Sequence, residues 1–276
     1  MLLTFGQPDY DTAMSDNAVN LIRRGGAAII EMNSPERMNA WSDRLSSELL
    51  QAVEAVADDT SIRAAMVTGA GRAFSSGADL KEGIELFKSG DFDPYRVLTE
   101  RYHPIITGIR EMAKPVVAAV NGPVAGVGVS LALACDLVVA TESSYFSLAF
   151  VNIGLVPDGG SSLFVPSRVG FARAAEMAIL GEPVAAAQAA EWGLINRVYA
   201  DAVFADEANA LLDRLADGPT KSYAGSKRQL NKWMYSNMAQ QLEFEADIQR
   251  EMAVSADFAE GLAAFIEKRP TKFTGA

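Results

Sequence analysis

Three short, almost wholly apolar runs constrain this fold more than any other feature of the sequence. They are AAMVTGAG from residue 64, KPVVAAVNGP from residue 114 and CDLVVAT from residue 135, and each is bounded by glycine, proline or polar residues. Short apolar runs that alternate with helical patterns are typical of strands buried on both faces of a parallel sheet. The sequence therefore predicts an α/β fold with a β/α core.

Helical patterns accompany these runs. In WSDRLSSELLQAVEAVADD, Ser42 is a suitable N-cap, and Leu45 and Leu49 begin an apolar series at helical spacing. EWGLINRVYA predicts a further strand, after which the sequence changes to long helical segments rich in Met, Gln, Glu and Ala. We therefore expect a core over residues 1–200 and a helical region over residues 201–276.

Composition narrows the class of partner. A net charge of −11 opposes nucleic-acid binding, which needs broad basic surfaces, although a few clustered cations could still bind a small anionic ligand. No apolar run reaches the ~18 residues of a membrane span, so no membrane partner is expected. The segment 1–17 lacks the basic and apolar parts of a signal peptide, which makes the cytoplasm the expected compartment.

The only cysteine and the only histidine are both interpreted as structural. Cys135 lies in an apolar run and is expected to pack as a small apolar side chain, since it has no partner for an internal disulfide. His103 has no second histidine for a metal and no nearby serine motif for a catalytic triad. We therefore expect no metal site.

Two glycine-rich stretches follow predicted strands. FSSGADLKE starts at Phe74, and NGPVAGVGVSLALACD leads into a compact helix that begins near Val127 or Gly128. A helix start has unpaired N–H donors, and two such starts facing one point would form an oxyanion hole. Each stretch alone also fits a plain strand-to-helix turn. GAGRAF suggests a dinucleotide site, but Phe74 replaces the third glycine of that motif.

A single acid stands between proline and two glycines in GLVPDGGSS. Pro, Asp and Gly at the second, third and fourth positions suit a tight turn, so Asp158 has a purely conformational interpretation. Its alternative role is a catalytic base directed into a pocket. Ser161 and Ser162, which follow it, are suitable caps for the next helix.

Taken in order, the motifs of this chain resemble the crotonase family, also called the enoyl-CoA hydratase/isomerase family. The resemblance covers most of the sequence and rests on these segments: ERMNAWS, FSSGADL, KPVVAAVNGPVAGVGVSLALACDLVVAT, FVNIGLVPDGGSSLFVPSRVG, AEWGLINRV and FIEKRP. It implies a crotonase-like spiral β/α core, a helical C-terminal region used for oligomerisation, and a homotrimer or a dimer of trimers. The implied partner is an acyl-CoA thioester.

The resemblance also assigns roles to single residues. It implies that the backbone N–H groups of Ala78 and Val127 bind the thioester oxygen. It places Arg37 near the nucleotide end of coenzyme A and Lys268 near the ligand of a neighbouring subunit. The remaining expected substrate contacts are Ser76, Gly77, Asp79, Leu80 and Phe150.

The chain departs from the hydratases of that family at two positions. Their two glutamates, which activate water, correspond here to Ser130 and Phe150, and neither side chain ionises usefully near neutral pH. Family isomerases carry their single carboxylate where Asp158 stands. The apolar neighbours Phe150 and Leu155 are expected to strengthen this base by hindering its solvation.

We therefore expect an enzyme that shifts a double bond from 3-enoyl-CoA to 2-enoyl-CoA, with Asp158 as acid and base. No cofactor is expected, because coenzyme A is part of the substrate. Two alternatives remain open. One is other enolate chemistry on an acyl-CoA, such as hydration or ring chemistry, and the other is an acyl-CoA-binding protein without catalysis.

Overall fold

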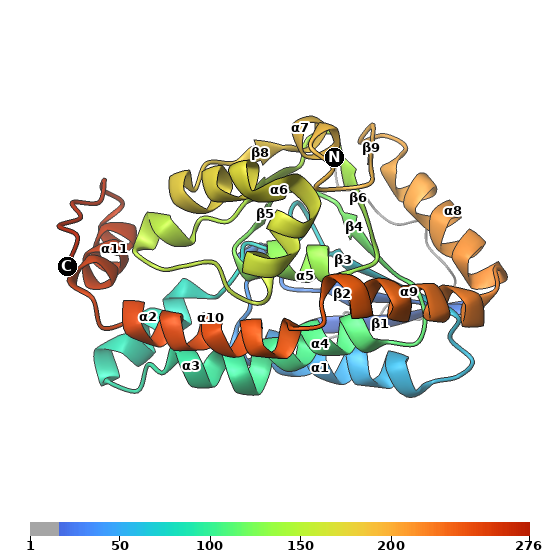
Figure 1. Cartoon of the computed structure of the whole chain (residues 1–276), viewed down its shortest axis with the longest axis horizontal. Coiled ribbons are helices and arrows are strands. Elements are labelled where there is room, and N and C mark those ends of the chain that lie inside the picture. The colour runs from blue at the N-terminus through green and yellow to red at the C-terminus, as the bar shows by residue number, and fades with distance from the viewer. Residues whose placement is uncertain (1–16) are drawn as a thin grey trace.

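The computed structural model describes residues 17–276, so the expectation that segment 1–17 is not a signal peptide falls almost wholly outside the described residues. Its main sheet has six strands in the order β1-β2-β3-β4-β6-β9 (Figure 1). All neighbours are parallel except β1 and β2, which pair antiparallel. The strands are β1 Val19–Arg24, β2 Ala27–Met32, β3 Ala64–Gly69, β4 Val116–Val120, β6 Leu137–Thr141 and β9 Arg197–Tyr199.

Alternate residues of the sheet face two different apolar layers, as the period of two in a strand requires. In β3, for example, Ala65 and Val67 belong to the larger core, whereas Ala64 and Met66 belong to the smaller one. Helices α1 Asp43–Asp58 and α4 His103–Glu111 cover the first face. Helix α8 Phe204–Asp217 covers the second.

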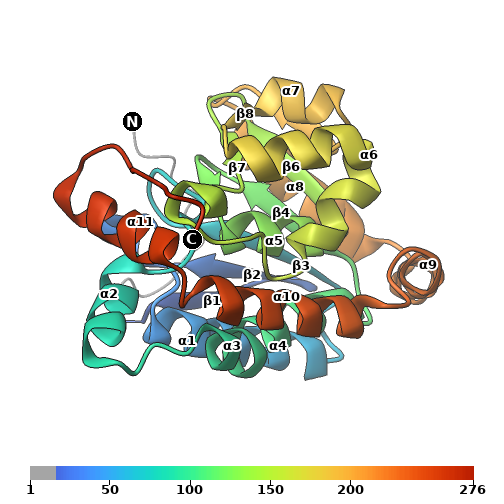
Figure 2. The same ribbon diagram turned by 60° about the vertical axis from the view of Figure 1, so that its left-hand side comes forward.

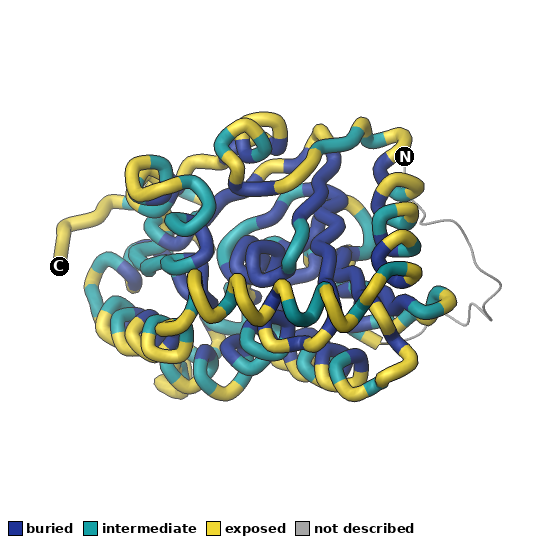
Figure 3. The backbone as a smooth tube through the Cα atoms, turned by 45° about the vertical axis from the view of Figure 1, so that its right-hand side comes forward, coloured by how far each residue is buried: buried dark blue, intermediate teal, exposed yellow. Residues whose placement is uncertain are grey.

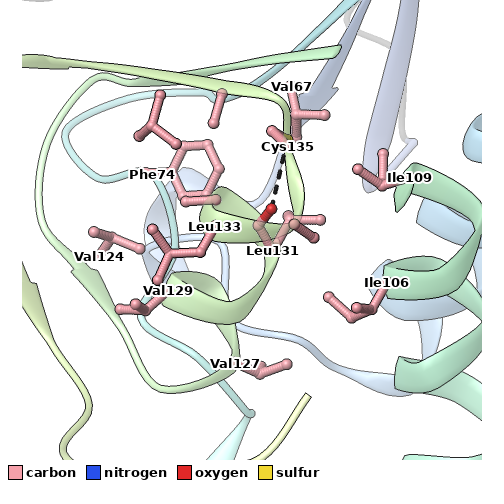
Figure 4. Packing of buried hydrophobic residues seen from close by; sticks show 14 of the residues in the cluster. Val67, Phe74, Ile106, Ile109, Val124, Val127, Val129, Leu131, Leu133 and Cys135 are labelled. Carbon is pink, nitrogen blue, oxygen red and sulfur yellow. Dashed lines mark hydrogen bonds between the residues drawn. The ribbon is translucent and has the colours of Figure 1, made fainter. Parts of the chain in front are cut away.

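Helix α5 Val127–Ala134 lies in the centre of the larger core, and every one of its residues is buried. Its apolar side chains pack against Phe74, Ile106 and Ile109, as Figure 4 shows. A short helix that is apolar all round must be enclosed by other elements. Cys135 directly follows it and is also buried, with its Sγ 3.5 Å from the carbonyl oxygen of Leu131.

The three strands expected from the apolar runs are confirmed as β3, β4 and β6, and the two helices expected after Ser42 and near Val127 are confirmed as α1 and α5. Ser42 caps α1 by accepting from the Leu45 N–H over 3.2 Å, and α5 begins at Val127, the first of its two expected starting residues. EWGLINRVYA forms only a three-residue strand, β9, because its first part completes helix α7 Ala186–Glu191 and the turn after it. The patterns did not reveal a second sheet of three short strands, β5 Val124–Ala125, β7 Tyr145–Ser147 and β8 Val184–Ala185.

The segment between β3 and β4 is largely helical. Helices α2 Leu80–Ser89 and α3 Pro94–Val97 are followed by a π-helical segment, η2 Leu98–Tyr102, that continues into α4. Two short 3₁₀ helices, η1 Pro35–Arg37 and η3 Phe150–Ile153, lie in other connections. Helix α6 Ser161–Leu180 is kinked at Gly170, which has a φ of 76°.

The C-terminal region is helical beyond β9, as expected, and its helices pack on the core. After α8 come α9 Thr220–Met234, α10 Met238–Met252 and α11 Ala256–Glu267. Helix α10 runs along α3 and contacts η2 and α6, while α11 contacts η3 (Figures 1 and 2). Figure 3 shows the buried central elements surrounded by partly exposed helices. Over residues 17–276, none of the helices has both the length and the apolar character needed to cross a bilayer.

Candidate active site

The two glycine-rich stretches lie side by side. Ser75 and Val124 form a parallel bridge, and the Ala125 N–H donates to the Ser75 carbonyl oxygen over 2.9 Å. Gly77 has a φ of 89°, and a Cβ on it would lie only 2.9 Å from the Ala125 carbonyl oxygen. A Cβ on Gly126 would lie 3.6 Å from the Gly77 Cα. The residues that follow these two glycines therefore start close to one another.

Those residues are Ala78 and Val127, and their N–H groups are free. Val127 is the first residue of α5, where a helix leaves its N–H groups without intrahelical partners. The backbone of Trp41 pairs with the residues on either side of Ala78: its N–H donates to the Gly77 carbonyl oxygen and its carbonyl oxygen accepts from the Asp79 N–H. The Ala78 N–H therefore takes no part in this pairing. Neither N–H donates to any acceptor within residues 17–276. Two free N–H groups in neighbouring turns can stabilise an anionic oxygen.

A turn at the start of α6 places Asp158 against α5. The Asp158 carbonyl oxygen accepts from the Ser130 hydroxyl over 2.7 Å and from the Ser161 hydroxyl over 2.8 Å. Gly159 and Gly160 have φ values of 60° and 87°. The turn therefore runs from Asp158 to Ser161 with Asp158 first, two residues later than the sequence pattern predicted. Two consecutive positive φ angles explain the need for two glycines.

Asp158 lines a cavity of about 100 Å³ together with Ala78, Asp79 and Leu80, so four of the predicted site residues share one cavity. The cavity lies between α1, α2, α3, η2, α10 and α11. Its apolar and aromatic wall consists of Trp41, Leu80, Leu86, Phe92, Val97, Leu98, Tyr102, Leu155, Phe258 and Leu262.

The Asp158 carboxyl group is buried and only half-satisfied. Its Oδ2 accepts from Nε2 of Gln249 over 2.7 Å, whereas its Oδ1 has no hydrogen-bond partner in the described part of the chain. Burial disfavours the charged form and raises the pKa of Asp158 to about 8, although the Gln249 hydrogen bond acts in the opposite direction. Leu155 belongs to the apolar wall of the cavity, as the sequence predicted.

The other three acids of the cavity wall are already engaged. Asp79 caps α2 through the Lys81 and Glu82 N–H groups, and its carboxylate forms an ion pair with Arg37. Asp43 pairs with Arg101 over 2.7 Å, and Glu82 accepts from the Asp43 N–H over 3.1 Å. Among the described residues of the wall, the buried acids are Asp79 and Asp158, and of these two only Asp158 lacks a cationic partner. Across residues 17–276, no group of three or more His, Cys, Asp or Glu is arranged to hold a metal ion.

Helix α10 contributes polar residues that the sequence patterns did not reveal. Glu245 accepts from the Gly160 N–H over 2.7 Å and from the Ser162 N–H over 3.1 Å, and burial raises its pKa to about 7. This carboxylate caps α6, so the expectation that Ser161 and Ser162 are the caps was wrong. Their hydroxyl groups instead contact the Asp158 carbonyl oxygen and the amide of Gln241. The only sequence signal for these contacts was the recurrence of a polar residue at every fourth position of α10, namely Gln241, Glu245 and Gln249.

The remaining predicted residues lie at different distances from the cavity. Val127 does not line the cavity, but it contacts the turn that carries Asp158, since a Cβ on Gly159 would lie 3.2 Å from Val127 Cγ2. Phe150, which was expected beside Leu155 in the apolar wall, does not line the cavity. It is buried in η3, and its ring lies 3.9 Å from where a Cβ on Gly126 would stand. Ser76, Gly77, Arg37 and Lys268 do not line the cavity, and Lys268 ends α11 as an exposed residue with positive φ.

Comparison with known proteins agrees with this geometry. The family model described as "Enoyl-CoA hydratase/isomerase" matches residues 23–276. The chain belongs to the enoyl-CoA hydratase/isomerase family. It is 41% identical over 250 residues to a "Probable enoyl-CoA hydratase" of Rhodobacter capsulatus, covering 91% of this chain and 95% of the relative. It is 38% identical, over the same shares, to "1,2-epoxyphenylacetyl-CoA isomerase" of Escherichia coli.

Solved structures of this family have the same fold. The crystal structure of an enoyl-CoA hydratase from Mycobacterium avium subsp. paratuberculosis superposes with a TM-score of 0.84 at 36% identity, covering 93% of this chain and 98% of that one. An enoyl-CoA hydratase/isomerase from Pseudoalteromonas atlantica gives a TM-score of 0.82 at 31% identity. The crotonase-like α/β core and the helical C-terminal region predicted from the sequence are therefore confirmed.

The contact between the two glycine turns can be tested with Gly77→Ala. We expect a loss of unfolding free energy of roughly 1–2 kcal/mol from the positive φ, and a further ~1 kcal/mol or more from the clash with Ala125. Gly90→Ala is the matched control, because Gly90 has a φ of 81° and no atom within 4 Å of its Cβ position. Equal losses in urea unfolding would contradict a close contact at Gly77.

Burial of Asp158 predicts a pH-dependent stability. The carboxyl group has a pKa of about 8 when folded and an ordinary value of 3.8, so it destabilises the fold progressively as pH rises from about 4 to about 8. We expect Asp158→Asn to gain stability relative to the wild type across that window, measured by urea unfolding at several pH values. Asp213→Asn should show the opposite sign, because Arg24 lowers the pKa of Asp213.

Proposed function

We propose that this protein isomerises 3-enoyl-CoA thioesters to 2-enoyl-CoA thioesters. Asp158 removes a proton from the α carbon, and the electron pair moves onto the thioester oxygen to give a dienolate. The free N–H groups of Ala78 and Val127 stabilise this oxyanion. Asp158 then returns the proton to the γ carbon, so one group serves as base and acid.

The observation that carries this proposal is the buried carboxyl group of Asp158, which has one oxygen without a partner and lies near two free N–H donors. Proton removal next to a thioester needs a base that is stronger than an ordinary aspartate, and burial supplies this. Oδ1 of Asp158 has no partner within the described residues, so it is available to a substrate. A binding protein without catalysis would have no reason to retain such a costly group.

Hydration is less well supported, because the water-activating positions hold no acid. The Ser130 hydroxyl is buried and committed to the Asp158 carbonyl oxygen over 2.7 Å. The second position is the buried ring of Phe150. Double-bond migration needs one proton carrier and changes no oxidation state, so we propose that it proceeds without a metal or redox cofactor.

The coenzyme A portion is proposed to lie along the α2 start, with backbone contacts from Ser76 to Leu80. Arg37 is ion-paired with Asp79 and half-exposed, so it can offer its outer face to a phosphate while it orients the cap of α2. Lys268 is exposed at the end of α11, the helix whose Phe258 lines the cavity. We propose it as a second cation for the coenzyme.

A second candidate is ring chemistry on a cyclic or aromatic acyl-CoA. The aromatic side chains of Trp41, Phe92, Tyr102 and Phe258 in the cavity wall favour it. So do two relatives, the 1,2-epoxyphenylacetyl-CoA isomerase and a "4-chlorobenzoyl coenzyme A dehalogenase-1" of Arthrobacter, which is 32% identical. A panel of 3-enoyl, 2-enoyl and cyclic acyl-CoAs, followed by mass and absorbance, separates these activities, because hydration adds the mass of water and isomerisation adds none.

The decisive variant is Asp158→Asn, which keeps the shape of the side chain and its preference for turns. We expect 3-enoyl-CoA isomerisation to fall by roughly a hundredfold or more while coenzyme A affinity is retained. Deuterium exchange at the substrate α carbon should fall in parallel, since exchange needs the same proton removal. Asp43→Asn is the control, because Asp43 also lines the cavity but is paired with Arg101. Undiminished exchange in folded Asp158→Asn contradicts the mechanism.

We also propose that the protein is a cytoplasmic homo-oligomer, a trimer or a dimer of trimers. Large apolar side chains are exposed on the C-terminal helices, including Leu230 and Trp233 on α9 and Phe244 on α10. Exposed apolar groups of this size commonly mark an interface. Light scattering at micromolar concentration should give at least three times the monomer mass, and a stable monomer would contradict the proposal.

A further inference from the structure

Helix α10 presents three polar side chains to the turn that carries Asp158. Gln241, Glu245 and Gln249 are spaced four residues apart and therefore lie on one face of the helix. Gln241 donates to the Ser162 hydroxyl over 2.8 Å, Glu245 caps α6, and Gln249 reaches Asp158 itself. The base is thus held by a segment about ninety residues later in the chain.

The amide of Gln249 has only one orientation that satisfies its neighbours. Its Nε2 donates to the Val156 carbonyl oxygen over 2.9 Å and to Asp158 Oδ2 over 2.7 Å, which uses both amide hydrogens. Its Oε1 accepts from the Val156 N–H over 3.4 Å. A flipped amide would place its oxygen against two acceptors. Gln249 is 2% exposed, so water does not replace these contacts.

We propose that Gln249 is the positioning residue of the proposed base and selects Asp158 Oδ1 as the oxygen that takes and returns the proton. The inference rests on the proposed function. When Asp158 is neutral, Oδ2 already accepts from Gln249, so the acidic hydrogen resides on Oδ1. When Asp158 is ionised, the same bond holds Oδ2 and leaves Oδ1 facing the substrate. One oxygen therefore carries the proton from the α to the γ carbon.

The effect of Gln249 on the pKa of Asp158 can be distinguished from the effects of the charged groups around Asp158. Glu245 of the same helix disfavours the ionised form, whereas the Gln249 hydrogen bond favours it, so the two act on the pKa of Asp158 in opposite directions. Tyr102 of η2 stays neutral, because burial and the nearby Asp158 raise the pKa of its phenol. The other ionisable groups of the cavity wall are Asp43, Asp79, Glu82 and Arg101.

Gln249→Met tests the proposal by removing both donors at nearly constant length. We expect kcat for isomerisation to fall about tenfold or more with little change in KM, since a hydrogen bond to a charged group is lost. The pH at which kcat is half-maximal should rise by about one unit. Gln241→Met is the matched control, because it removes one hydrogen bond donated by a side-chain amide on the same helix face. That hydrogen bond goes to Ser162 and not to Asp158. Its pH profile should match the wild type.

An infrared titration measures the same effect without substrate. The carboxyl C=O band that disappears in Asp158→Asn should titrate about one pH unit higher in Gln249→Met than in the wild type, and unchanged in Gln241→Met. An unchanged midpoint, or an equal shift in Gln241→Met, overturns the positioning role. A shifted midpoint in a protein that never isomerises 3-enoyl-CoA overturns the proposed function instead. Gln249→Leu is read in the same way should the methionine variant fail to fold.

Discussion

The burial of one carboxyl group, that of Asp158, is the constraint on which the rest of the site depends. A buried acid is unfavourable when charged, so the surrounding segments must hold it through other contacts. The Ser130 and Ser161 hydroxyls bind its carbonyl oxygen, and Gln249 binds one carboxyl oxygen. The group therefore stays inside an apolar wall with a raised pKa. Burial of this charge lowers stability locally, and in the proposed mechanism it makes Asp158 a stronger base than a solvated aspartate.

The second constraint is the close approach of two backbone turns. Gly77 and Gly126 come so near that side chains would separate them, and this contact brings the free N–H groups of Ala78 and Val127 together. Strand pairing supports it, because Ser75 and Val124 form a bridge directly before the turns. The fully buried helix α5 then holds the Val127 N–H in a fixed position. The proposed chemistry thus depends on backbone geometry at least as much as on side chains.

Much of the fold could be predicted because its signals are local. The apolar runs at residues 64, 114 and 135 each became a strand of the main sheet, and the Ser42 cap marked the start of α1 correctly. The short strands β5, β7 and β8 could not be predicted, since two or three residues carry no period. The turn at Asp158 begins two residues later than predicted, because both glycines after Asp158 adopt positive φ.

By itself, the sequence determined the family, the glycine turns, the start of α5 at Val127 and the presence of one acid at residue 158, because each depends on neighbouring residues. Only the tertiary structure decided how that acid is held. Gln249 contacts Asp158 across 91 residues, and Glu245 caps α6 from a similar distance. The ion pair between Arg37 and Asp79 could not be predicted from the sequence either. Contacts of this kind arise from the packing of whole helices, which a local pattern does not encode.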